Sequence, residues 1–178
     1  MTFADWLIND LVFIAIALLW AAAAKLDLGF RAPAWRGVWP WVALYVAWYA
    51  AEWVVFALLP VAEDPEWVTE LLGLPLAGQL ILTVVSGPIF EELLFRGAMF
   101  SALLRRWGIQ AAAIAPSVLW ALMHVGYEAW FIFSIAGSGV VLAIIRWKSG
   151  SLWPPLALHV MGNLVVTLDP YSWFAATG

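Results

Sequence analysis

The chain has 178 residues, of which 65% are hydrophobic and 11% are charged, and its formal net charge is −4. Soluble domains are about half apolar and a quarter charged, so this composition excludes an ordinary soluble domain and predicts an integral membrane protein. The absence of cysteine excludes disulfides, thiol catalysis and thiolate metal sites. The acidic balance gives no reason to expect a nucleic-acid partner.

Apolar segments of about the length that crosses a bilayer, roughly 20 residues, follow one another along the chain. They cover residues 5–24, 38–60, 76–104, 109–126, 130–146 and 152–168. We therefore expect an all-α integral membrane protein with six transmembrane helices. No repeat or linker divides the chain, so residues 1–178 should form one membrane domain, and the role of the two helices in residues 1–75 is unassigned.

The first segment is expected to be a helix rather than a signal peptide, because it lacks a basic n-region, begins with Asp5 and Asp10, and leads into a basic loop. Basic and acidic residues alternate between the successive loops. Loops rich in Lys and Arg stay cytoplasmic, so both termini should lie outside a bacterial cytoplasmic membrane. The basic set is Lys25, Arg31, Arg36, Arg105, Arg106, Arg146 and Lys148, and the acidic set is Asp5, Asp10, Glu63, Asp64, Glu66, Glu70, Glu128 and Asp169.

Few ionisable side chains remain at membrane depth. A charge at mid-bilayer costs at least about 2.5 to 3.5 kcal/mol, so such residues are functional candidates. Most of them fall in the C-terminal half, which predicts a shared polar site there. They are Glu52, Glu91, Glu92, Arg96, His124 and His159.

Glu91 and Glu92 are adjacent but should have different partners. Residues four apart share one helix face, so Glu92 can pair with Arg96 in a buried ion pair. Glu91 is turned about 100° away and need not share that partner. It is therefore the candidate general base.

His124 and His159 are the only histidines, and they lie on different segments from the glutamates. Asn163 follows His159 at i+4, which places an amide and an imidazole on one helix face. The pair could donate two hydrogen bonds to an oxyanion. Alternatively, Asn163 makes a structural interhelical hydrogen bond.

Proline positions add to this pattern. Pro88 follows Ser86 and Gly87 and cannot donate a backbone hydrogen bond, so a kink is expected beside Glu91. Such a kink could open a water-filled cavity. Pro154 and Pro155 instead suit the first turn of the last helix.

Three motifs occur in order on separate segments. Residues 86–100 carry E-E-x-x-x-R, residues 117–124 resemble F-x-x-x-H with Trp120 in place of Phe, and residues 159–163 match H-x-x-x-N. The chain thereby resembles the CPBP family of intramembrane proteases, the CAAX-protease and bacteriocin-processing (Abi-type) group. The resemblance covers about residues 78–168 and implies a catalytic core in residues 76–168, formed by helices three to six.

The resemblance also implies residue roles. Glu91 and His124 would activate a water that attacks the scissile peptide carbonyl, and His159 and Asn163 would stabilise the oxyanion. Glu92 and Arg96 would hold the helix and tune the site. The substitution of Trp120 for the usual Phe would change the shape of the substrate pocket.

A metal is not favoured. Two histidines and a glutamate would be an acceptable zinc set with an open position, but H-E-x-x-H is absent and the ligands would have to come from three helices. Zinc therefore stays possible, while the His159 and Asn163 pair favours a metal-free, glutamate-type mechanism.

The leading hypothesis is an intramembrane endopeptidase whose protein or peptide substrate enters laterally from the bilayer. One alternative is a non-catalytic peptide-binding or bacteriocin-immunity protein. Another is a proton-coupled transporter, because intramembrane carboxylates also mark proton relays. Glu52 fits the transporter better, although a protonated Glu52 in an interhelical hydrogen bond would also explain it.

Overall fold

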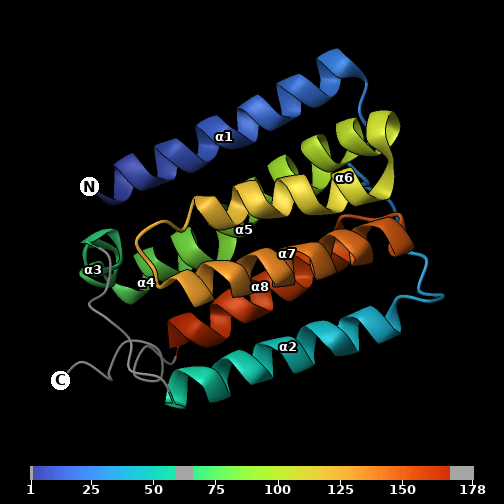
Figure 1. Ribbon diagram of the computed structural model, residues 1–178. Coiled ribbons are helices and arrows are strands. Elements are labelled where there is room, and N and C mark those ends of the chain that lie inside the picture. Colours follow the sequence, from blue (N-terminus) through green and yellow to red (C-terminus); the bar gives the residue numbers. More distant parts are fainter. Residues whose placement is uncertain (1, 59–65, 169–178) are drawn as a thin grey trace.

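A computed structural model describes residues 2–58 and 66–168, and these ranges are helical with no β-strand. The long helices lie side by side in a bundle (Figure 1). The elements are α1 (Phe3–Ala24), α2 (Trp39–Leu58), α3 (Glu66–Leu72), α4 (Leu76–Gln79), η1 (Leu80–Ser86), α5 (Gly87–Glu91), η2 (Glu92–Met99), α6 (Phe100–Leu122), α7 (Ala129–Ser149) and α8 (Trp153–Leu168).

Helix α1 begins where its sequence provides a capping box. The Thr2 hydroxyl accepts the Asp5 backbone N–H at 3.3 Å, and the Asp5 carboxylate accepts the Thr2 N–H at 2.8 Å. The helix ends at Lys25, which has a left-handed conformation with φ of 51°. The observed bounds therefore agree closely with the expected segment 5–24.

The elements from α4 to α6 form one continuous run that turns sharply at Gly108, where φ is 78° and ψ is −174°. The φ value lies in the region that glycine adopts without strain. The two limbs of the run correspond to the expected segments 76–104 and 109–126. The second limb ends at Leu122, so His124 lies in the turn after the helix rather than on it.

The first limb contains two π-helical stretches, η1 and η2, on either side of the short helix α5. The Gly87 N–H bonds to the Leu82 carbonyl, five residues back. Pro88 has no N–H for the next such bond, so the Thr83 carbonyl loses its π-helical partner. At Pro88, where a kink was expected, the hydrogen bonding changes from π-helical to α-helical. π-Helical turns often occur at functional sites.

Within residues 2–58 and 66–168, three stretches are long and apolar enough to cross a membrane: α1, the run Leu76–Leu122 and α7. The 16-residue helix α8 is apolar but shorter. The chain is therefore an all-helical, multi-pass membrane protein. Helix α3 was not expected, because its residues were assigned to a loop between two apolar segments.

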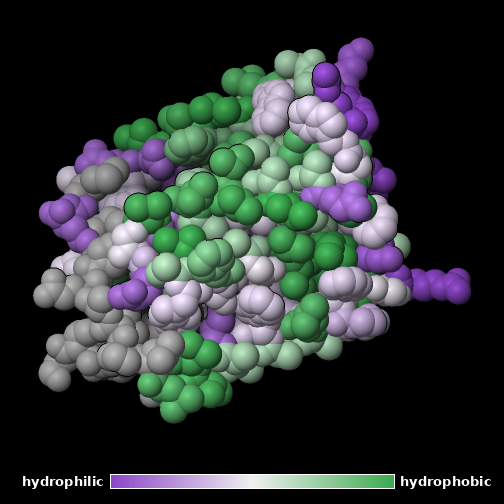
Figure 2. Space-filling model, viewed as in Figure 1, coloured by the Kyte–Doolittle hydropathy of each residue, from purple (hydrophilic) through white to green (hydrophobic). Residues whose placement is uncertain are grey.

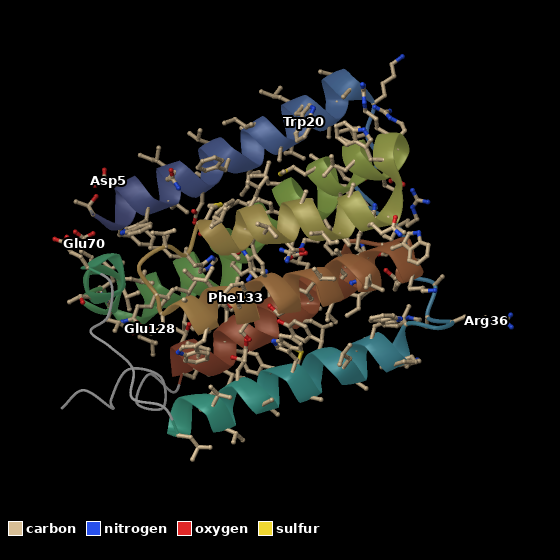
Figure 3. All side chains as sticks on the ribbon, in the orientation of Figure 1. Asp5, Trp20, Arg36, Glu70, Glu128 and Phe133 are labelled. Carbon is tan, nitrogen blue, oxygen red and sulfur yellow. The ribbon has the colours of Figure 1, made fainter. Side chains whose placement is uncertain are left out.

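The charges expected in the loops lie at opposite ends of the bundle. Figure 3 places Asp5, Glu70 and Glu128 at one end and Arg36 at the other. Apolar side chains cover the middle of the face seen in Figure 2, and hydrophilic ones gather at its two ends. Three acidic residues of the expected set, Glu63, Asp64 and Asp169, lie outside the described residues.

Two charged residues differ from the expected loop positions. Asp10 lies two turns inside α1 and is only 6% exposed, with Oδ2 accepting a hydrogen bond from Ser86 Oγ at 2.6 Å. Arg146 lies within the last turn of α7 and is only 4% exposed. Both helices extend past the apolar core of their segments, so these charges are buried between helices instead of lying in loops.

Candidate active site

A cavity of about 570 Å³ opens among α1, α2, η1, α5, α7 and α8. It contains all four residues expected to perform chemistry, and two further carboxylates from the N-terminal helices. These polar lining residues are Glu91, His124, His159, Asn163, Asp10 and Glu52. Glu92 and Arg96 do not line it, because they are fully buried behind its wall.

The Glu92 and Arg96 ion pair expected from the i+4 spacing is present. Arg96 Nη1 donates to Glu92 Oε1 at 2.9 Å, and both residues are 0% exposed. Gly139 of α7 makes room for the guanidinium, since a Cβ at this position would lie 2.9 Å from Arg96 Nη2. The pair is therefore enclosed between η2 and α7.

His159 brings the two glutamates together. Its Nδ1 lies 3.0 Å from Glu92 Oε1, and its Nε2 lies 3.4 Å from Glu91 Oε2. A neutral imidazole has only one N–H, so both contacts can be hydrogen bonds only if one glutamate is protonated and donates to the ring, or if the ring carries two protons. The arrangement therefore permits proton exchange between Glu91 and His159.

Glu91 faces away from Arg96, as the helix geometry predicts, but it does have a hydrogen-bond donor. Trp120 Nε1 donates to Glu91 Oε2 at 2.6 Å. The Glu91 side chain is 14% exposed, so one part of the carboxylate is accessible from the cavity. The Trp120 N–H therefore orients the Glu91 carboxylate, and a molecule in the cavity can contact it.

Trp120 also contacts His124, His159 and Arg96. Its ring packs edge-on against His124 and His159, with centroid distances of 5.6 and 5.2 Å. The Arg96 guanidinium lies over the ring at 4.2 Å, a cation–π geometry. The sequence predicted a pocket-shaping role for Trp120. It did not predict the bond to Glu91, although an indole N–H is the one donor that Phe lacks.

His124 shares the cavity with Glu91, but no hydrogen bond joins the two in the described part of the chain. His124 Nδ1 lies 3.0 Å from the Trp120 carbonyl oxygen. A carbonyl only accepts, so Nδ1 carries the proton and Nε2 of the neutral ring is left as an acceptor.

Asn163 connects α8 to η1. Its Nδ2 donates to the Thr83 carbonyl at 2.7 Å, which is the carbonyl that lost its π-helical partner at Pro88. This contact matches the structural alternative for Asn163. The amide has a second N–H, and the residue lines the cavity, so the oxyanion role stays a prediction.

The two N-terminal helices supply carboxylates that sequence reasoning did not place at the site. Asp10 of α1 accepts from Ser86, and Glu52 of α2 accepts from Ser134 Oγ, which in turn accepts the Trp48 indole N–H at 2.9 Å. The signal in the sequence that could have assigned Glu52 to the site was its position at membrane depth. Asp10 was missed because it lies near the start of its segment.

The possible zinc set does not fit the geometry. Among the described residues, no three His, Asp or Glu side chains are grouped so that they could hold a metal ion. Both nitrogens of His159 face carboxylates, and His124 is turned to a backbone oxygen.

Comparison with known proteins agrees with the motifs. The family described as "Type II CAAX prenyl endopeptidase Rce1-like" matches residues 73–165. The chain is 25% identical over 158 residues to the Bacillus subtilis (strain 168) protein named "Putative membrane peptidase YdiL". The aligned region covers 87% of this chain and 57% of that protein. No solved structure matches. The chain thus spans little more than half the length of that relative, and it belongs to the Rce1-like family of type II CAAX prenyl endopeptidases, within the CPBP group that its motifs resemble.

Proposed function

We propose that the chain is an intramembrane endopeptidase that hydrolyses a peptide bond of a membrane-associated protein or peptide. The observation that carries this proposal is the contact of His159 with both Glu91 and Glu92 at the wall of a cavity. An acid–base group in contact with a second titratable group, open to a cavity, is the arrangement that water activation needs.

Glu91 is the general base. Its carboxylate takes one proton from a water in the cavity, while Nε2 of His124 accepts a hydrogen bond from that water's other O–H and so orients it. The hydroxide attacks the scissile carbonyl carbon, and the carbonyl oxygen becomes an oxyanion. Glu91 then returns its proton to the leaving nitrogen, so that a carboxylic acid and an amine are released.

His159 and Asn163 stabilise the oxyanion. The 3.4 Å contact of His159 Nε2 with Glu91 is longer than a strong ionic hydrogen bond. When Glu91 accepts the water proton, it loses its charge. The N–H at His159 Nε2 can then donate to the oxyanion instead of to Glu91. The second amide N–H of Asn163 supplies the other donor.

Glu92, Arg96 and Trp120 position these groups. Glu92 holds His159 through Nδ1, Arg96 neutralises Glu92, and Trp120 holds the Glu91 carboxylate through its indole N–H. The mechanism uses glutamate and histidine alone, without a metal.

The bilayer setting completes the proposal. We assign six transmembrane helices, with the catalytic core in residues 76–168. The protein lies in the bacterial cytoplasmic membrane, with the acidic end and both termini outside. The substrate enters the cavity laterally between helices. The apolar outer surface in Figure 2 supports a lipid setting for this route.

The test is cleavage of a candidate membrane substrate by the purified protein. Glu91→Ala and Glu91→Gln should lose activity by about 10² to 10⁴-fold, the contribution of a general base. Glu128→Ala is the matched control, because Glu128 is an exposed residue outside the cavity. Cleavage at the wild-type rate by both Glu91 variants would refute the proposal.

A further inference from the structure

A second cavity, of about 360 Å³, lies at the other end of the bundle from Glu128. It is formed by the loop that follows α1, the first turns of α6 and the end of α7, which lie at one end of the bundle in Figure 1. Its charged lining residues are four basic and one acidic: Lys25, Arg31, Arg105, Arg146 and Asp27.

Arg146 is the buried cation of this cavity. The residue is 4% exposed, and Nη2 donates to the Asp27 backbone carbonyl at 3.1 Å. Nε has no hydrogen-bond partner, and no carboxylate forms an ion pair with this guanidinium in the described residues. A buried charge without a directly paired carboxylate is costly, so an external anion would stabilise it.

Gly29 fixes the position of this guanidinium. Its φ is 80°, and a Cβ there would lie 2.5 Å from Arg146 Cζ. The Phe100 ring lies 5.6 Å from the same Cζ. The guanidinium is thus held between a glycine backbone and an aromatic ring, with its cationic group at the wall of the cavity.

The only lining carboxylate is already occupied. Asp27 forms an ion pair with Arg31. Partial burial alone would raise the pKa of Asp27, but the Gly29 N–H and the Arg31 guanidinium outweigh burial and hold that pKa below its usual value. Asp27 is therefore charged at neutral pH, forms its ion pair with Arg31 and acts on Arg146 only without a direct ion pair, so one acidic group faces four basic ones.

Two more cations of the cavity lack a carboxylate partner in the described residues. Lys25 is exposed at the left-handed end of α1. Arg105 is also exposed, and within the described residues its side chain makes a single long hydrogen bond, of 3.4 Å, to the Ala24 carbonyl. Together with Arg146, these residues leave three positive charges around one small cavity.

We propose that this cavity binds a phosphate group, supplied by the headgroup of an anionic phospholipid. Guanidinium and ammonium groups are the usual partners of phosphate. Basic pockets between membrane helices on the cytoplasmic side bind anionic headgroups. Trp147, which also lines the cavity, is 44% exposed and carries Lys148 against its ring, as expected at a membrane interface. None of the residues assigned to peptide hydrolysis lines this cavity, so the proposal does not depend on that activity.

The experiment measures lipid binding to the full chain in detergent by native mass spectrometry, with phosphatidylglycerol and phosphatidylcholine as probes. Wild type should prefer phosphatidylglycerol. Lys25→Gln and Arg105→Gln should each weaken its binding about fivefold, as expected for one basic residue near a phosphate. Arg36→Gln and Arg106→Gln are the matched controls, because these exposed residues do not line the cavity, and they should bind as wild type does.

Arg146→Gln should have the largest effect, but it changes a buried residue, so its thermal unfolding is checked first. The two exposed variants decide the result if Arg146→Gln does not fold. Equal binding of the two lipids, or equal weakening in all four exposed variants, would overturn the site.

A third arm titrates inorganic phosphate. Failure of phosphate to displace bound phosphatidylglycerol at millimolar concentration supports the lipid as the source. Binding of phosphate that is lost in Lys25→Gln and Arg105→Gln, without any preference for phosphatidylglycerol, would overturn the lipid as the source.

Discussion

The buried arginines beside the two cavities have opposite environments. Behind the first cavity, Arg96 forms an ion pair with Glu92, which also contacts His159, so this arginine has a carboxylate partner. At the second, Arg146 has one backbone oxygen. A membrane protein can thus neutralise a buried charge with its own side chains, which suits a reaction that must start from a fixed geometry. It can also leave a buried charge without a paired side chain, so that a bound ligand can neutralise it.

This difference predicts that neutralising one charge has unequal consequences at the two cavities. At the first, removal of one partner leaves another charge buried and unpaired. At the second, removal of an exposed cation leaves the remaining contacts intact.

The largest effect is expected for Glu92→Gln. This change leaves the fully buried Arg96 without a countercharge and should lower the free energy of unfolding by about 3 to 5 kcal/mol. Unfolding of the purified protein in detergent measures it, with the exposed Glu128→Gln as control. The double variant Glu92→Gln with Arg96→Met should recover much of the loss, because it removes both charges. A loss below about 1 kcal/mol in Glu92→Gln would show that the ion pair does not hold the helices.

Trp120→Phe tests the bond to Glu91 without removing the aromatic ring. Loss of a hydrogen bond to a charged group costs about 1.5 to 3 kcal/mol, so the cleavage rate should fall about tenfold or more. A positioning residue should lower kcat with little change in KM. Trp107→Phe is the control, because Trp107 is 62% exposed and outside the cavity. A rise in KM alone would instead support the pocket-shaping role expected from the sequence.

The helix positions could be predicted from the sequence wherever an apolar run had clear ends. The segments expected at 5–24 and 152–168 are observed as Phe3–Ala24 and Trp153–Leu168. Bilayer thickness fixes the length of such runs, so composition is enough. Helix α3 has only seven residues and two glutamates, and no such length rule identifies it.

The site could be predicted only as far as single helices determine it. The i+4 spacing gave the Glu92 and Arg96 pair, because both residues lie on one helix. The contacts of His159 depend on how α8 packs against α5 and η2, which no local pattern records. Asp10 and Arg146 were expected in loops because charged side chains are usually exposed. Both are buried, and whether a charged residue is buried between helices depends on the fold.

Glu52→Gln should have a small effect. The Glu52 carboxylate accepts the Ser134 hydroxyl, and the amide oxygen of Gln can accept the same hydrogen bond. The free energy of unfolding should therefore change by no more than about 1 kcal/mol, and cleavage by no more than about threefold. The transporter alternative makes a different prediction, since Gln cannot carry a proton in a relay. Proton uptake into proteoliposomes that disappears in Glu52→Gln, with no cleavage in wild type, would favour transport.

The smallest effect on stability is expected for Lys25→Gln and Arg105→Gln in neutral detergent without phospholipid. Both side chains are exposed and have no carboxylate partner in the described residues, so the free energy of unfolding should stay within about 0.5 kcal/mol of wild type. Their removal also reduces repulsion around Arg146, which opposes any loss. Adding phosphatidylglycerol should then separate wild type from the variants, because only a bound anion makes these cations stabilising. A loss as large as that of Glu92→Gln in the absence of lipid would mean that Lys25 and Arg105 serve the fold, and the contrast between the two cavities would disappear.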